Sequence, residues 1–158
     1  MSTRTIGLAI LATLVAAAPA AAAPDHTFGG TEPQEWSWAG APGGGLSDVL
    51  AQVGCHEGVN CDYTLFEVTD PGPLTLRTTG DLDTLVDGDV HLYVSDEAGA
   101  VGQEIGAATN FTPNETLTVD VDPGYYVMMY AYTGFGTYSG EASWMPRPPE
   151  EEEPPFEE

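Results

Sequence analysis

Hydrophobic and polar residues alternate with a period of two over most of the chain beyond residue 60. In residues 62–68 (DYTLFEV), Thr64, Phe66 and Val68 share one face of an extended chain, and the residues between them share the other. The same alternation recurs in residues 74–79, 90–96 and 116–121. Turn sequences with glycine or proline (DPGP, DEAG and DPG) separate these segments, so the pattern predicts short β-strands joined by turns.

Further segments extend this pattern towards both ends of the chain. Residues 125–133 (YYVMMYAYT) are apolar on both faces, which predicts a central strand buried on both sides or a face that meets a partner. Trp36 and Trp38, two positions apart, predict a short strand, and residues 137–144 predict a closing strand. Residues 101–108 have only a weak pattern.

Together these segments predict an all-β fold, an antiparallel jelly-roll-like β-sandwich. Strands of about six residues with turn signals about every 8–12 residues are typical of such sandwiches. We assign residues 24–145 to this domain. Its first part, residues 25–34, is polar with a glycine pair and a proline, which predicts a flexible N-terminus. Residues 146–158 (PRPPEEEEPPFEE) predict a disordered, acidic tail.

Residues 1–23 differ in character from the rest of the chain. A polar start with Arg4 precedes the apolar run Ile6–Ala18, and small, alanine-rich residues follow. This order predicts a secretory signal peptide that is cleaved between Ala20 and Pro24. The alternatives are a buried helix and a membrane anchor, for which the apolar run is short. We therefore expect a secreted, extracellular protein with no membrane span in the mature chain.

The mature chain is strongly acidic. It has two arginines, Arg77 and Arg147, no lysine and 25 acidic residues, which gives a formal charge of −23. Such a charge repels nucleic acids and anionic lipids, so we exclude both as partners, whereas it attracts cations and basic partners. The acidity fits a high-salt habitat, where screening relieves self-repulsion, and it equally fits a calcium-rich or merely acidic extracellular milieu.

The two cysteines, Cys55 and Cys61, lie in the run GCHEGVNC. An even number of cysteines in an exported chain predicts a disulfide, which here would pin a small loop. The alternative is a metal site formed by Cys55, His56 and Cys61, but this spacing lacks the paired motifs of zinc sites.

An acidic loop is the candidate metal site. Its aspartates are Asp81, Asp83, Asp87 and Asp89. Aspartates at alternate positions of a turn can supply the several oxygen ligands that Ca²⁺ requires, so the loop predicts Ca²⁺ as a cofactor. The spacing is not that of an EF-hand loop. The alternative is a solvated acidic loop in an acidic protein.

Four segments in order carry a resemblance to a known family: DYTLFEVTDPGPLTLRTTG, DGDVHLYVSDEAG, LTVDVDPGYYVMMYAYTG and GTYSGEASW. They lie within residues 62–144, which resemble the bacterial pre-peptidase C-terminal domain, a relative of the collagen-binding domains of clostridial collagenases. The resemblance implies a jelly-roll-like β-sandwich of the kind appended to exported proteins, and calcium binding as in some relatives. His91 departs from the family pattern, which often has an aspartate there, and this sequence contains no protease domain.

Tyrosines crowd the last predicted hairpin. Four of them are candidates for a binding surface: Tyr125, Tyr130, Tyr132 and Tyr138. Aromatic residues serve in collagen and sugar recognition, because their rings stack well and tyrosine adds a polar group. The alternative, which the usual burial of apolar strands favours, is that these rings pack in the core.

Two sequons for N-glycosylation lie close together. They are Asn110-Phe-Thr and Asn114-Glu-Thr. Pro113 follows the first and disfavours its use, so Asn114 is the candidate glycosylation site.

Catalytic motifs are absent from the sequence. It contains neither G-x-S-x-G nor H-E-x-x-H, and paired carboxylates carry no weight in a chain so rich in them. We therefore predict that the protein is not an enzyme. The leading hypothesis is a secreted, non-catalytic binding module that contacts an extracellular protein or polysaccharide, with calcium as a stabilising ligand. The alternative is a structural subunit of a cell-surface or filament assembly.

Overall fold

The computed structural model describes residues 23–40, 60–80, 85–134 and 137–148, which form nine β-strands. The strands are β1 (His26–Phe28), β2 (Gln34–Gly40), β3 (Asn60–Val68), β4 (Gly72–Gly80), β5 (Leu85–Ser95), β6 (Val101–Ala108), β7 (Glu115–Val121), β8 (Gly124–Gly134) and β9 (Tyr138–Trp144). These parts of the chain contain no helix, and hence none that could cross a membrane. Every segment in which the alternation predicted a strand contains one, and the weakly patterned residues 101–108 form β6.

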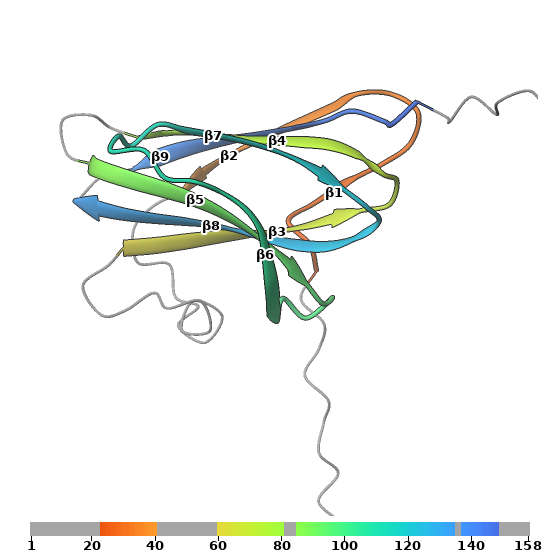
Figure 1. The fold of residues 1–158 in the computed structure, drawn as a ribbon, viewed down its shortest axis with the longest axis horizontal. Helices are drawn as coiled ribbons and strands as arrows, with labels where there is room; N and C mark the ends of the chain where they lie inside the picture. Colours follow the sequence, from red (N-terminus) through yellow and green to blue (C-terminus); the bar gives the residue numbers. More distant parts are fainter. Residues whose placement is uncertain (1–22, 41–59, 81–84, 135–136, 149–158) are drawn as a thin grey trace, which may run out of the picture.

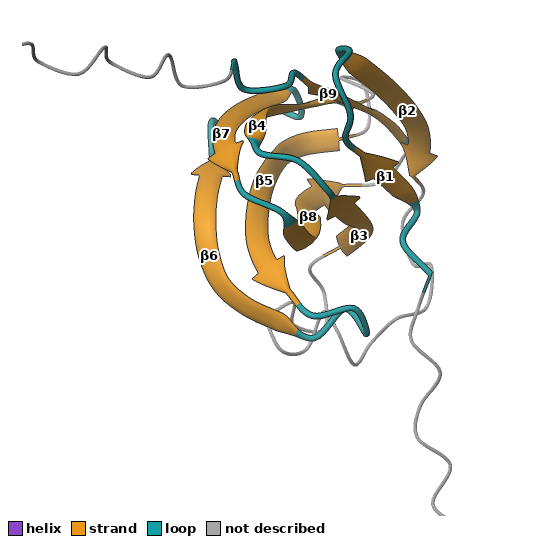
Figure 2. Ribbon diagram, turned by 90° about the vertical axis from the view of Figure 1, so that its right-hand side faces the viewer, coloured by secondary structure: helices purple, strands orange, loops and turns teal. Residues whose placement is uncertain are grey.

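The strands form two sheets that face each other (Figure 1 and Figure 2). The five-stranded sheet has the order β1-β3-β8-β5-β6, and the four-stranded sheet has the order β2-β9-β4-β7. Neighbouring strands are antiparallel except for β1 and β3, which are parallel. Figure 2 shows β6 curving towards β7 of the other sheet, which it contacts. The all-β sandwich predicted from the sequence is confirmed.

The hydrophobic core lies between the two sheets. Its largest fully buried hydrophobic side chains are Trp144, Tyr130, Phe28, Phe66, Leu74 and Leu76. β8 lies between β3 and β5, and residues 126–130 are all buried. The central strand buried on both faces, which the apolar run predicted, is therefore confirmed.

The N-terminal segment is part of the five-stranded sheet, so the prediction of a flexible N-terminus is wrong. Asp25 N donates to the carbonyl of Leu65 and Asp25 Oδ2 accepts from Leu65 N, both at 2.8 Å. Phe28 of β1 is fully buried. The side chain of Gln34 closes the following turn, because it accepts from Gly29 N at 3.1 Å and donates to Gly29 O at 2.6 Å. The partner strand lies 40 residues away, which is why local composition did not reveal the pairing.

Two stacked indoles mark β2, which forms one edge of the four-stranded sheet. The ring centroids of Trp36 and Trp38 lie 4.8 Å apart, and both rings meet Phe66 at a steep angle. Trp38 lies directly on Gly140 of β9, where a Cβ atom would overlap the indole. This close approach requires glycine at residue 140. The strand predicted from the two tryptophans is confirmed.

Candidate binding surfaces

Three of the four tyrosines predicted as a binding surface belong to the core. Tyr130, Tyr132 and Tyr138 are 0%, 2% and 3% exposed, and their rings lie against one another between the sheets. The prediction of a binding surface is wrong for these residues, and the alternative of core packing holds. Tyr130 Oη donates to the carbonyl of Pro113 at 2.7 Å, and Tyr138 Oη donates to Asp62 Oδ2 at 3.0 Å. Tyr132 Oη is buried without a hydrogen-bond partner among the described residues. Tyr125, by contrast, is only half-buried.

A different set of aromatic side chains points away from the core, on the outer face of the five-stranded sheet. This tyrosine face, as we call it, consists of the half-buried residues Tyr63, His91, Tyr93 and Tyr125. They alternate along β3, β5 and β8 with residues of the core cluster. In the register, Tyr63 and His91 flank Met129, and Tyr93 is the neighbour of Val127. The face therefore draws on three adjacent strands.

Carboxylates stand beside the rings of the tyrosine face. Tyr125 Oη donates to Glu67 Oε1 at 3.3 Å, and His91 Nδ1 lies 3.0 Å from Glu104 Oε2. Tyr93 also hydrogen-bonds to Glu104, its partner across an irregularity in the β5–β6 pairing. Burial, followed by the bond to Glu104 and its charge, raises the pKa of Tyr93 to about 12. The Tyr93 hydroxyl therefore stays protonated, as a donor, at neutral pH.

No arginine lies on the described part of the tyrosine face. Arg77 lies on β4 of the other sheet, and Arg147 follows β9, within 3.7 Å of Asp120 and 3.6 Å of Asp122. Asp89 lies two residues before His91 on β5 and adds a further carboxylate. The tyrosine face thus combines aromatic rings with negative charge that neither of the two described arginines, Arg77 and Arg147, neutralises.

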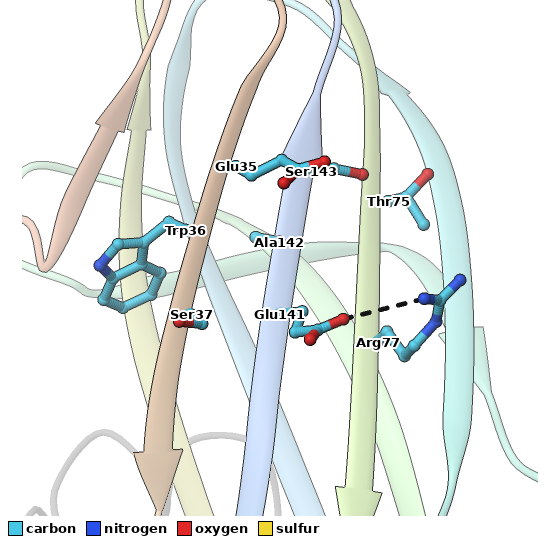
Figure 3. Close-up of a pocket in the computed structure, with 8 residues that line it drawn as sticks. All are labelled: Glu35, Trp36, Ser37, Thr75, Arg77, Glu141, Ala142 and Ser143. Carbon is cyan, nitrogen blue, oxygen red and sulfur yellow. Dashed lines mark ion pairs between the residues drawn. The ribbon is translucent and has the colours of Figure 1, made fainter.

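A groove of about 400 Å³ lies on the outer face of the four-stranded sheet (Figure 3). It is lined by Glu35, Trp36, Ser37, Thr75, Arg77, Glu141, Ala142 and Ser143. The register aligns the outward-facing members in two rows across β2, β9 and β4: Ser37–Glu141–Arg77 and Glu35–Ser143–Thr75. Arg77 Nη1 lies 3.8 Å from Glu141 Oε2. Figure 3 shows the indole of Trp36 pointing away from this pair.

The predicted calcium loop is described only in part. Asp81 and Asp83 lie outside the described residues, whereas Asp87 and Asp89 lie on β5. Asp87 Oδ1 is buried and has no hydrogen-bond partner among the described residues. Burial, followed by the charge of Asp87, raises the pKa of Asp89. Within the described ranges, no three acidic, cysteine or histidine side chains group in a way that could hold a metal ion.

The predicted disulfide is likewise described only at one end. Cys61 is buried at the start of β3 and is not a free cysteine. Cys55, together with His56, lies outside the described residues. The pairing of Cys55 with Cys61 stays a prediction.

The two sequons lie at the connection between β6 and β7. Asn110 is tied to the buried Glu115, because its backbone N and its Nδ2 both donate to that carboxylate at 2.8 Å. Asn114 is exposed, and its Oδ1 accepts from Gly80 N at 3.1 Å. Both acceptors are exposed, and the glycosylation of Asn114 stays a prediction.

Comparison with known proteins gives a likeness of fold. No family model and no curated protein matches the sequence. The chain is similar to the pre-peptidase C-terminal domain of collagenase from Bacillus anthracis, with 15% identity and a TM-score of 0.42, over 75% of this chain and 95% of that one. It is also similar to the SPBc2 prophage-derived protein YomS, with 16% identity and a TM-score of 0.41, over 74% and 97%. The first match is a member of the family that the sequence segments resemble, and no ligand or partner of this chain follows from either.

Proposed function

We propose that this protein is a secreted, non-catalytic binding module that binds a basic protein through its tyrosine face. The observation that carries the proposal is the pairing of half-exposed rings with carboxylates, as in Tyr93 and His91, which share Glu104. A lysine or arginine of a partner would meet both groups here, since the ring face attracts a cation and the carboxylate accepts its hydrogen bond. The charge of −23 on the mature chain would speed the encounter.

A pair of peptides tests this proposal. The mature protein is titrated with an arginine-rich peptide and with the same peptide in which citrulline replaces every arginine. Citrulline keeps the shape of the side chain and removes its charge. We expect the arginine peptide to bind, salt to weaken this binding, and the citrulline peptide to bind at least about tenfold more weakly.

Two variants separate this surface from general attraction to an acidic protein. Glu104→Gln and Asp120→Asn each remove one negative charge, the first on the tyrosine face and the second on the other sheet. We expect Glu104→Gln to weaken binding about tenfold and Asp120→Asn to change it less than about twofold. Equal effects of the two variants, or equal binding of the two peptides, would contradict the proposal.

Stabilisation by calcium is a further part of the proposed function. It is supported by Asp87 Oδ1, because a buried carboxylate oxygen without a partner is relieved by a cation. We expect millimolar calcium to raise the melting temperature of the mature protein, and replacement of Asp87 and Asp89 by asparagine to abolish the rise. Identical melting temperatures in calcium and in chelator would remove this part.

A structural role in a surface assembly is the second candidate function. The observation that favours it is β2, a seven-residue strand that pairs within the described residues with β9 on one side only. An open strand edge can pair with a strand of another copy. Sedimentation of the mature protein at high concentration and high salt tests this candidate: assembly is expected, and a strictly monomeric protein would count against it.

A further inference from the structure

The groove on the four-stranded sheet offers a binding site distinct from the tyrosine face. Its centre is the middle strand β9, with Glu141 and Ser143, and β2 and β4 form its sides. The small Ser143 lies between the longer Glu35 and Thr75 in one row, so the surface is hollowed there. The volume of about 400 Å³ falls within the range of about 300–1,000 Å³ that is usual for ligand sites.

The groove presents donors and acceptors of hydrogen bonds side by side. Three hydroxyl side chains can do both, two carboxylates accept, and the guanidinium of Arg77 donates. At 3.8 Å, Arg77 and Glu141 lie farther apart than a charge-assisted hydrogen bond requires, and their side chains are 59% and 65% exposed. Each of the two therefore keeps capacity for a hydrogen bond to a ligand.

We propose that this groove binds a neutral, hydroxyl-rich ligand, namely a segment of a polysaccharide chain. Neighbouring sugar hydroxyls can donate to Glu141 and accept from Arg77 at the same time, and the hydroxyl side chains of the second row extend this pattern. The groove is open at the surface rather than enclosed, so a chain can lie in it without an end having to enter (Figure 3).

Charge favours a neutral polysaccharide over an anionic polysaccharide or a basic peptide as the ligand of this groove. An anionic polysaccharide would meet two carboxylates and only one arginine in the groove, within a chain that repels anions overall. A basic peptide would meet Arg77, whereas the described part of the tyrosine face has no arginine. A neutral saccharide avoids both kinds of repulsion, so the two outer faces of the sandwich suit two different ligands.

The test is calorimetric titration of the mature protein with neutral oligosaccharides of glucose, mannose, xylose and N-acetylglucosamine. We expect at least one of them to bind. Arg77→Ala should weaken this binding about tenfold or more, because a hydrogen bond from a charged group is lost. Ser143→Tyr, which fills the hollow without changing charge, should weaken it as well. Arg147→Ala is the matched control and should change the affinity less than about twofold.

The possible outcomes separate this inference from the proposed function. Absence of binding to every oligosaccharide, or equal losses in Arg77→Ala and Arg147→Ala, would overturn the saccharide site. Binding of the arginine-rich peptide should be the same in Arg77→Ala as in the unmodified protein, because that peptide is expected on the other sheet. If Glu104→Gln loses peptide binding but still binds the saccharide, the result supports a separate saccharide site in the groove.

Discussion

Tyr138 Oη donates a hydrogen bond of 3.0 Å to Asp62 Oδ2 and thereby links β9 of one sheet to β3 of the other. Trp38 Nε1 donates to the same hydroxyl at 3.4 Å, so β2 takes part in the link. Burial, followed by the charge of Asp62, raises the pKa of Tyr138. The phenol therefore remains a donor under all ordinary conditions and ties the two sheets together at one end of the sandwich.

Removal of this hydroxyl tests how much the link stabilises the fold. Tyr138→Phe leaves the ring in place but deprives a half-buried carboxylate of a donor. We expect the free energy of unfolding to fall by about 1–3 kcal/mol, measured by urea denaturation. Tyr125→Phe is the control, because its hydroxyl bonds to Glu67 on the outer face, and its effect should stay within about 0.5 kcal/mol. Equal losses in both variants would show that the link has no special role.

The pH dependence of stability should reveal Asp62. Burial raises the pKa of this carboxyl above its ordinary value of 3.8, so the folded protein holds the proton more tightly than the unfolded chain. Its contribution to stability is complete below pH 3.8 and is lost as the pH rises through the higher, folded pKa. Asp62→Asn removes the titrating carboxyl. We therefore expect its free energy of unfolding, measured by urea denaturation, to improve relative to the unmodified protein as the pH rises through the pKa of folded Asp62. A difference that is constant with pH would contradict this assignment.

Gly140 is expected to tolerate no side chain. Gly140→Ala would place a methyl group inside the Trp38 indole, so the ring must move and the edge strand β2 must loosen. We expect a loss of about 1–3 kcal/mol in the free energy of unfolding and a change in tryptophan fluorescence. Gly124→Ala is the control, since its nearest neighbour atoms would lie 3.8 Å away, at ordinary contact distance. An unchanged fluorescence spectrum in Gly140→Ala would show that the ring does not rest there.

Glu115 is expected to stabilise the connection between β6 and β7. It is 2% exposed, and its two carboxylate oxygens accept both donors of Asn110. Glu115→Ala leaves these donors without their partner, and we expect a loss of about 2–3 kcal/mol by thermal or urea unfolding. Glu115→Gln keeps the size and one acceptor oxygen, so its loss should be smaller. A ranking in which glutamine is as damaging as alanine would point to the negative charge rather than to the hydrogen bonds.

The alternation of side chains was sufficient to predict the sandwich. It placed Leu74 and Leu76 opposite Thr75 and Arg77, and the former pair is buried in the core as expected. It also predicted that residues 125–133 form a central strand. These predictions succeed because the two-residue period depends on local geometry and on which face meets the core.

The binding surfaces were harder to predict because they depend on distant partners. Tyr130 is core because the carbonyl of Pro113, 17 residues earlier in the chain, accepts from its hydroxyl. Tyr93 lies beside Glu104 because of an irregularity in the β5–β6 pairing, which the sequence alone does not reveal. The alternation did place Tyr93 on the face opposite the core, and this was the only sequence feature that pointed to an outward-facing ring. Neither the alternation nor the composition could show that Arg77 and Glu141 lie side by side on adjacent strands.

The placement of the arginines has a practical consequence for detecting this protein. Trypsin cuts after lysine or arginine, and beyond residue 4 the sequence offers only Arg77 and Arg147. Arg77 lies within β4, paired on both sides by β7 and β9, and the bond after Arg147 leads into Pro148, which trypsin does not cleave. The folded domain should therefore resist trypsin. For the same reason, routine tryptic proteomics would yield only very long peptides, and a protease that cuts at acidic residues should be used instead.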